Sequence, residues 1–351
     1  MKHEHIYVHE HEHAHHHDRA HHHTHHHTHE HGYAHDEKGE SVLEVRHLSI
    51  SFSEYDGKFG KKDVDVISDL NVSIKSGEIV AVVGSSGSGK SLLAHAILGI
   101  LPYNASFHGE IKYNGESLTD EKIKKLRGNE IVLVPQSVNY LDPLMKTGKQ
   151  LCRGKKDASL VDKVKRTFAR YGLDENTIEL YPFELSGGMT RRVLISSAVM
   201  ESPKLVIADE PTPGLHASAA RRVLSHFREM ADEGAGVLLI THDLELALEC
   251  ADRVVVFYAG QTIEEARPVD FGSEDTLRHP YTKALYRALP QNGFKPIVGS
   301  QPYAEEMPDG CTFAPRCEFV CDECRKGKID YYPLDGGYVR CIRAKSADAE
   351  E

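Results

Sequence analysis

Residues 84–91 carry a pattern whose residue types and spacing suit phosphate binding. The run reads Gly-Ser-Ser-Gly-Ser-Gly-Lys-Ser and fits G-x-x-x-x-G-K-[ST] without a gap. Glycines in such a loop let successive backbone N–H groups turn inward around a phosphate. The lysine would reach the β- and γ-phosphates of a nucleotide, and the last serine would bind Mg²⁺. The candidate nucleotide-binding residues of this run are Gly84, Ser85, Ser86, Gly87, Ser88, Gly89, Lys90 and Ser91.

Two adjacent acids provide the second half of such a site. Asp209 and Glu210 directly follow the apolar run Leu-Val-Ile-Ala at residues 205–208. Asp209 would enter the Mg²⁺ shell, and Glu210 would accept a proton from the attacking water. The plainer alternative is a solvated strand end. An intact phosphate-binding run elsewhere in the chain favours the catalytic interpretation.

Both motifs need strands that deliver them and helices that follow them. The β-branched run at residues 78–83 ends at the glycines, which predicts a buried parallel strand, and residues 92–98 favour a helix. Strand-like runs also occur at residues 42–45, 69–75, 131–134, 205–208, 237–240 and 254–258, and helical stretches at 158–171 and 218–233. Strands that alternate with helices predict an α/β sheet domain.

Three further motifs identify a family. Leu-Ser-Gly-Gly-Met spans residues 185–189, Gln136 follows an apolar run, and His242 lies in Leu-Ile-Thr-His-Asp. With the phosphate-binding loop (P-loop) and the two acids, this set resembles the ATPases of ATP-binding cassette (ABC) transporters over residues 41–268. The resemblance implies a P-loop NTPase ABC fold, with a RecA-like core and a helical subdomain at about residues 137–200.

The resemblance also implies roles, with ATP and Mg²⁺ as cofactors. Gln136 would join Ser91 and Asp209 around Mg²⁺, and His242 would contact the γ-phosphate beside Glu210. Phe52 occupies the place of the adenine-stacking aromatic, with Tyr55 as a nearby rival. Two ATPases would dimerise head to tail. The nucleotide on each P-loop would then be capped by the partner's copy of Ser186, Gly187 and Gly188.

One segment departs from the family pattern. After the two acids, members commonly have Ser/Thr-Ala-Leu-Asp, whereas residues 213–216 read Pro-Gly-Leu-His here. The segment normally crosses to the partner subunit. His216 would weaken or retune that coupling, unless the Pro-Gly pair is a tolerated turn variant.

Local similarities narrow the subfamily. The run His-Pro-Tyr-Thr-Lys-Ala-Leu at residues 279–285 resembles the segment just past the ATPase core in oligopeptide, dipeptide and nickel importers. Residues 98–102 and 180–189 are similar to nickel-import ATPases in particular. The resemblance implies a peripheral protein at the cytoplasmic face of the membrane. Its partners would be a second, non-identical ATPase, two permeases and an external solute-binding protein.

The cysteines of the C-terminal region, residues 269–351, form another candidate site. In similar tails of oligopeptide and dipeptide ATPases, some members bind a [4Fe–4S] cluster. Four thiolates suit iron–sulfur or zinc, and the best-matching residues are Cys311, Cys317, Cys324 and Cys341, with Cys321 as an extra candidate. Buried thiols and an empty site are the alternatives. Cys152 and Cys250 lie apart and are expected to be structural.

The histidines gather at the N-terminus, where residues 1–35 hold 17 of the 24. Residues 1–40 have almost no aliphatic side chains and are expected to be disordered. Imidazoles bind Ni²⁺, Co²⁺, Cu²⁺ and Zn²⁺. The mixing of His with Glu, Asp, Thr and Ala favours a native metal-binding arm over a purification tag. The arm favours nickel or a related transition metal as cargo, with a peptide importer that carries a metal-buffering tail as the alternative.

Composition excludes several other classes. The chain has 351 residues and a net charge of −11, from 42 basic and 53 acidic residues, which disfavours a nucleic-acid binder held by phosphate contacts. No apolar run reaches the ~18 residues of a membrane span, and the first residues lack the apolar core of a secretory signal. An ABC ATPase without a membrane partner and a histidine-rich storage protein are the remaining rivals. Intact Lys90, Asp209, Glu210 and His242 count against storage.

Overall fold

The computed structural model describes residues 40–56, 60–85, 87–200 and 202–347, and these belong to one compact unit. The histidine-rich arm expected at residues 1–40 lies outside this part of the chain, apart from residue 40 itself. Among the described residues, no helix combines the length and the apolar character needed to cross a bilayer.

A parallel sheet forms the centre of the fold, as the α/β pattern predicts. Its strands lie in the order β9-β3-β8-β7-β6. Their bounds are Ile79–Val83 for β3, Ile131–Val134 for β6, Leu205–Asp209 for β7, Gly236–Thr241 for β8 and Arg253–Tyr258 for β9. Strands β3 and β8 are buried along their whole length, which explains their continuous apolar sequences.

Antiparallel strands continue the sheet on the other side of β9. Strand β10 (Gln261–Ala266) pairs antiparallel with β9 and makes one parallel pairing with β2, between Gln261 and Asp69. Beyond it the order is β2-β1-β4-β5. These strands span Ser41–Asp56 for β1, Gly60–Lys75 for β2, Ala105–Tyr113 for β4 and Glu116–Ser117 for β5.

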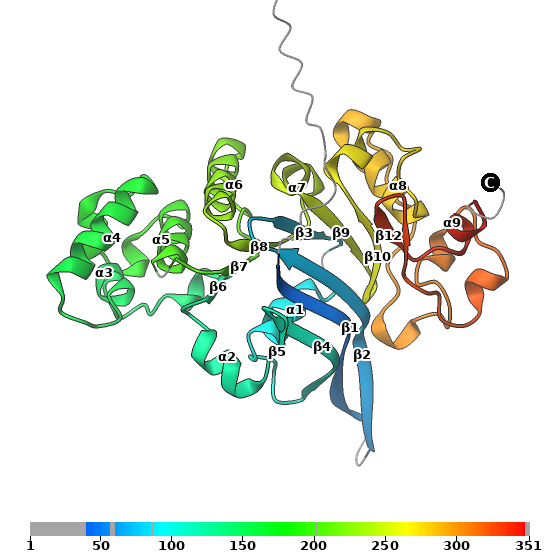
Figure 1. Ribbon diagram of the computed structural model, residues 1–351, viewed down its shortest axis with the longest axis horizontal. Helices are drawn as coiled ribbons and strands as arrows, with labels where there is room; N and C mark the ends of the chain where they lie inside the picture. Colours follow the sequence, from blue (N-terminus) through cyan, green and yellow to red (C-terminus); the bar gives the residue numbers. More distant parts are fainter. Residues whose placement is uncertain (1–39, 57–59, 86, 201, 348–351) are drawn as a thin grey trace, which may run out of the picture. The chain divides into compact units, whose positions relative to one another are not determined.

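Helices cover both faces of the central strands. Along β3, Ala81 and Val83 pack into the core cluster that contains Phe227 of α6 (Ala217–Asp232), while Val80 packs into the cluster that contains Leu93 of α1 (Lys90–Ile97). Helix α7 (Leu244–Cys250) lies beside α6, and Figure 1 shows both on the opposite side of the sheet from α1. Along each central strand, alternate side chains therefore pack into two separate hydrophobic cores, one on each face of the sheet.

A helical lobe follows β6 and has a core of its own. It contains α3 (Thr147–Leu151), α4 (Ala158–Arg170) and α5 (Gly187–Val199), packed around residues such as Phe168 and Val193. Helix α2 (Asp120–Leu126) precedes β6. Short 3₁₀ turns occupy Val138–Tyr140, Glu175–Glu179, Pro182–Glu184, Pro268–Gly272, Pro290–Asn292, Ala304–Glu306, Ala314–Arg316 and Glu323–Arg325.

The C-terminal residues join the central sheet. Strand β12 (Gly337–Val339) pairs with β10 through Val339 opposite Glu264, and with β11 (Tyr332–Leu334). Helices α8 (Pro280–Ala288) and α9 (Ile342–Ala347) complete this region, on the right of Figure 1. The domain boundary at residue 268 stays a prediction, since the described residues on both sides of it form one compact unit.

Candidate nucleotide-binding site

The P-loop turns between the end of β3 and the start of α1, where only glycine suits several positions. Gly87 has φ +77° and Gly89 has φ +94°, in the left-handed region that side chains disfavour. A Cβ on Gly84 would lie 2.2 Å from the carbonyl oxygen of Phe257 on β9. Glycine is therefore required at these positions, because of positive φ at Gly87 and Gly89 and because of the close approach of β9 at Gly84. Ser86 lies outside the described residues.

The Lys90 side chain hydrogen-bonds to the backbone of the P-loop. Its ammonium donates hydrogen bonds to the carbonyls of Gly84 at 2.9 Å and Ser85 at 2.8 Å. Burial lowers the pKa of Lys90, and the charges of Glu210 and Asp209 act in the opposite direction. The site thus holds a buried cation within the loop, an arrangement suited to the β- and γ-phosphates.

The predicted Mg²⁺ ligands Ser91 and Asp209 meet where β7 ends above the start of α1. The Ser91 hydroxyl donates a hydrogen bond to Asp209 Oδ1 at 3.1 Å. Burial raises the pKa of Asp209, and the bond from Ser91 opposes that shift. A hydroxyl and a carboxylate that share one point are oxygen ligands of the kind Mg²⁺ prefers.

Glu210 and His242, which are 32 residues apart in the sequence, form a direct pair. The His242 Nδ1 and Glu210 Oε2 atoms lie 2.8 Å apart. Glu210 is buried, whereas the His242 side chain is 57% exposed. The Glu210 backbone has φ +47°, and its N–H donates to the Ile240 carbonyl of β8. The imidazole therefore contacts a buried carboxylate, as the predicted roles of a general base and its neighbouring histidine require.

Gln136 follows β6, and its side chain is exposed. The segment is fastened by Arg191 of α5, which donates to the carbonyls of Pro135 at 2.6 Å and Gln136 at 2.9 Å. Arg191 is buried, and that burial lowers its pKa. Sequence reasoning missed this residue. The available signal was an arginine pair, Arg191 and Arg192, in a helix otherwise without charges.

Replacement of Arg191 by methionine is expected to destabilise the fold and slow ATP hydrolysis. It leaves the buried Pro135 carbonyl and the partly buried Gln136 carbonyl without their cationic donor, at a cost of about 1–3 kcal/mol in the free energy of unfolding. Urea unfolding measures this loss. Arg166→Met, at an exposed position of α4, is the matched control and should change little. An Arg191→Met protein as stable and active as the wild type would contradict this assignment.

The Ser-Gly-Gly segment lies away from the chain's own P-loop. The Ser186 hydroxyl accepts a hydrogen bond from the Met189 N–H at 3.3 Å and so caps the exposed start of α5. In Figure 1, α5 belongs to the helical lobe, apart from α1. Gly187 and Gly188 leave the helix start open, because a Cβ on Gly187 would meet nothing within 4 Å. The structure thus does not bring this segment to the chain's own loop.

The two aromatic candidates differ in exposure. Phe52 is partly buried and packs against the core cluster that includes the buried side chains of β1, whereas Tyr55 is 82% exposed near the end of the same strand. Adenine stacking by either residue stays a prediction. In the departing segment, Gly214 has φ +77° and His216 is exposed, just before α6.

The C-terminal cysteines gather without forming a ready metal site. Across the described part of the chain, no three His, Cys, Asp or Glu side chains are arranged to hold one metal ion, so the expected site is absent in that form. Even so, Cys311, Cys317, Cys324 and Cys341 all line one small cavity. Cys321 Sγ lies 3.3 Å from Cys324 Sγ. Burial raises the pKa of Cys311 to about 11.

Comparisons with known proteins identify the family of this chain. A family model described as "ABC transporter" matches residues 67–213, and one described as "Oligopeptide/dipeptide transporter, C-terminal region" matches residues 263–324. The oligopeptide transport ATP-binding protein OppD of Escherichia coli is 33% identical over 82% of this chain and 89% of its own length. A putative peptide import ATP-binding protein of Brucella abortus is 35% identical, over 87% and 95%. The oligopeptide transport ATP-binding protein AppD of Bacillus subtilis is 33% identical, over 89% and 99%.

Solved structures show the same fold. A dimeric ATP-binding cassette in a post-hydrolysis state, bound to ADP and Pi, has a TM-score of 0.56 at 24% identity and covers 64% of this chain and 98% of its own. The family models and the curated relatives extend this similarity to the sequence, through the ATPase core and the C-terminal region. The chain therefore belongs to the ABC transporter ATPases that carry the oligopeptide/dipeptide C-terminal region, and it hydrolyses ATP to drive transport.

Proposed function

We propose that this chain is an ATPase subunit of an importer that takes up peptides. The observation that supports this proposal most strongly is the sequence similarity of the chain to peptide-import ATPases, which extends through both the ATPase core and the C-terminal region. This supports the peptide alternative of the sequence interpretation over nickel or a related transition metal. The argument for metal cargo depends on the histidine-rich arm, which lies outside the described residues. In a peptide importer that arm buffers metal and does not identify the cargo.

Hydrolysis follows from the geometry of the buried groups. Lys90 and the loop amides would hold the β- and γ-phosphates. Ser91 and Asp209 would hold Mg²⁺, which would supply positive charge to the phosphate oxygens. Glu210, oriented by His242, accepts a proton from the water that attacks the γ-phosphorus. The bond between that phosphorus and the bridging oxygen of ADP breaks, which releases ADP and phosphate.

A partner ATPase completes each site in this proposal. The exposed start of α5 at Ser186 offers N–H donors and a positive helix end to a nucleotide on the other subunit. The dimeric cassette with ADP and Pi supports this arrangement by similarity of fold. We expect a heterodimer that docks on two permeases at the cytoplasmic face of the membrane, supplied by an external solute-binding protein.

The cargo is tested by stimulation of the assembled complex. The chain is purified with its second ATPase, both permeases and the binding protein in lipid nanodiscs, and phosphate release is measured. Peptides of two to eight residues are expected to raise ATPase activity several-fold, and Ni²⁺ alone to leave it unchanged. Stimulation by Ni²⁺ or a nickel chelate, without a response to peptides, would overturn the peptide assignment and restore metal import.

We also propose that the cysteine cavity binds a [4Fe–4S] cluster or zinc. The fit is chemical: four soft thiol donors, Cys311, Cys317, Cys324 and Cys341, line one cavity. Such a group would cross-link the C-terminal region.

Metal content distinguishes this proposal from buried, metal-free thiols. Protein purified without oxygen should contain iron and sulfide, or zinc, and Cys311→Ser should lose most of that content. Cys250→Ser is the matched control, since Cys250 Sγ donates to the Leu246 carbonyl and serine can make the same bond. Wild-type protein free of iron, sulfide and zinc would contradict the proposal.

A further inference from the structure

A residue of the C-terminal region contacts the P-loop directly. The Ser85 hydroxyl, at the second position of the loop, donates a hydrogen bond to Gln301 Oε1 at 2.5 Å. Gln301 lies 216 residues after Ser85 in the sequence. A residue outside the cassette motifs considered above therefore contacts the P-loop.

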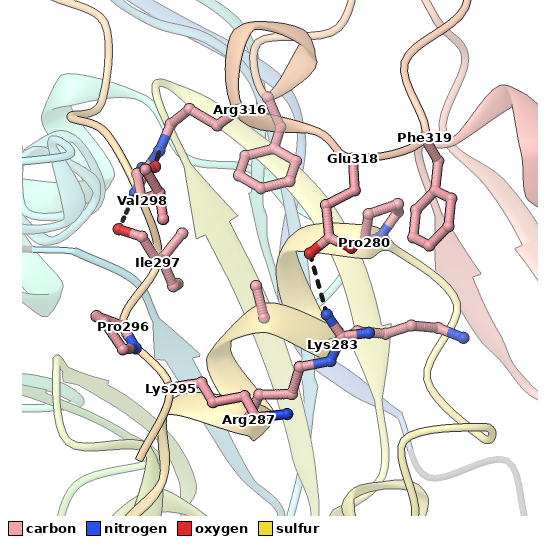
Figure 2. A pocket seen from close by; sticks show the side chains of 12 residues that line it. Pro280, Lys283, Arg287, Lys295, Pro296, Ile297, Val298, Arg316, Glu318 and Phe319 are labelled. Carbon is pink, nitrogen blue, oxygen red and sulfur yellow. Dashed lines mark hydrogen bonds and ion pairs between the residues drawn. The ribbon is translucent and has the colours of Figure 1, made fainter. Parts of the chain in front are cut away.

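The segment that carries Gln301 is itself fixed by Arg316. The guanidinium donates from Nε to the Val298 carbonyl at 2.8 Å and from Nη2 to the Ile297 carbonyl at 3.1 Å. A third bond runs from Nη1 to the buried Tyr258 hydroxyl at 3.2 Å. Figure 2 shows Arg316 reaching across to Ile297 and Val298 at the wall of a cavity of about 230 Å³. One planar side chain thus ties residues 297–298 to strand β9.

Ser85 is held on two sides. Its hydroxyl bonds to Gln301, and its carbonyl accepts a hydrogen bond from Lys90 Nζ at 2.8 Å. The position of this carbonyl helps to set where the lysine ammonium lies. Movement of Ser85 would therefore also move the Lys90 ammonium, which is the predicted phosphate ligand.

We propose that Arg316, residues 297–298 and Gln301 form a C-terminal brace, which positions the P-loop for nucleotide binding. Arg316 and Gln301 are positioning residues that act through Ser85 and Lys90. Arg316 immediately precedes Cys317, so the brace runs from the cysteine cavity to the P-loop. The proposal depends on ATP binding by this family and is independent of the cargo and of metal in the cavity.

A double-mutant cycle on the full-length chain tests the brace. Binding of a fluorescent ATP analogue with Mg²⁺ is measured for Gln301→Ala, Ser85→Ala and the double variant. Each single change should weaken binding about three- to tenfold, the value of one hydrogen bond. The double variant should bind the analogue as tightly as the single variant with the lower affinity, because each single change already removes the same Ser85–Gln301 hydrogen bond. The KM for ATP should rise while kcat changes little, since the loop holds ground and transition states alike.

Further variants separate positioning from simple loss of structure. Arg316→Lys should weaken nucleotide binding in the same direction, because an ammonium cannot reproduce the planar fork that reaches two carbonyls and Tyr258. Arg287→Gln is the matched control, since Arg287 lines the same cavity but pairs with Glu274 and Glu318. It should leave nucleotide affinity unchanged.

Thermal unfolding midpoints are recorded for every variant in this series. Loss of affinity at an unchanged midpoint, with non-additive effects in the cycle, supports the brace. Wild-type affinity in Gln301→Ala, or losses at Ser85 and Gln301 that simply add, would overturn it. If Gln301→Ala does not fold, Ser85→Ala is tested by itself, because it removes the same hydrogen bond by deleting only the Ser85 hydroxyl oxygen. Wild-type affinity in Ser85→Ala then contradicts the proposal.

Discussion

Replacement of Glu210 by glutamine is expected to stop ATP hydrolysis while ATP stays bound. Glutamine keeps the size of the side chain but cannot accept the proton of the attacking water. Glu210 is buried and lies 2.8 Å from His242, so no bulk water replaces its role as base. Loss of a general base typically costs about 100- to 10,000-fold in rate. We expect kcat to fall within that range.

Single-turnover phosphate release and nucleotide binding are measured on the same Glu210→Gln preparation. Glu245→Gln, at an exposed position in the first turn of α7, is the control and should keep wild-type kcat. Because Lys90, Ser91 and Asp209 are untouched, the affinity for ATP should be kept. A Glu210→Gln variant that hydrolyses ATP within tenfold of the wild-type rate would remove Glu210 from its assigned role.

Replacement of Lys90 by alanine is expected to abolish useful nucleotide binding. The ammonium is buried against the loop carbonyls of Gly84 and Ser85, where a charge-assisted bond to phosphate is strong. Hydrogen bonds to charged groups contribute about 1.5–3 kcal/mol each, and the lysine is placed to reach two phosphates. We therefore expect the Kd for Mg-ATP to rise about 100-fold.

Titration calorimetry with Mg-ATP measures this change. Lys124→Ala, on the exposed face of α2, removes a lysine of the same charge away from the loop and should bind ATP normally. The loss should affect ATP and ADP, because the β-phosphate is common to both. Retention of wild-type affinity in Lys90→Ala would place the nucleotide elsewhere.

The sequence predicted the central sheet, and it predicted that the candidate site residues lie at the ends of its strands, because local patterns determine both. The β-branched run before Gly84 and the apolar run before Asp209 form the buried strands β3 and β7. Parallel strands end at one edge of a sheet, so the P-loop and the acids had to meet. The Ser91–Asp209 contact follows from that topology.

Contacts between distant segments could not be predicted in this way. Arg191 reaches the Gln136 carbonyl, and Gln301 reaches Ser85, through tertiary packing that leaves no periodic signal in the sequence. The pairing of β12 with β10 is of the same kind, since β12 is only three residues long. The transported molecule could not be predicted from the sequence either. In the proposed importer the ATPase never touches the transported molecule, so its motifs carry no contact that distinguishes a peptide from nickel.

Uptake of labelled peptide into proteoliposomes tests the central claim most directly. The complete complex is reconstituted with ATP supplied on the side of the ATPases, and a matched complex carries Glu210→Gln in this chain. The account predicts accumulation of peptide that requires ATP and is lost in the Glu210→Gln complex, although that complex still binds ATP. Equal uptake by the two complexes, or uptake without ATP, would contradict the claim that hydrolysis at this P-loop drives import.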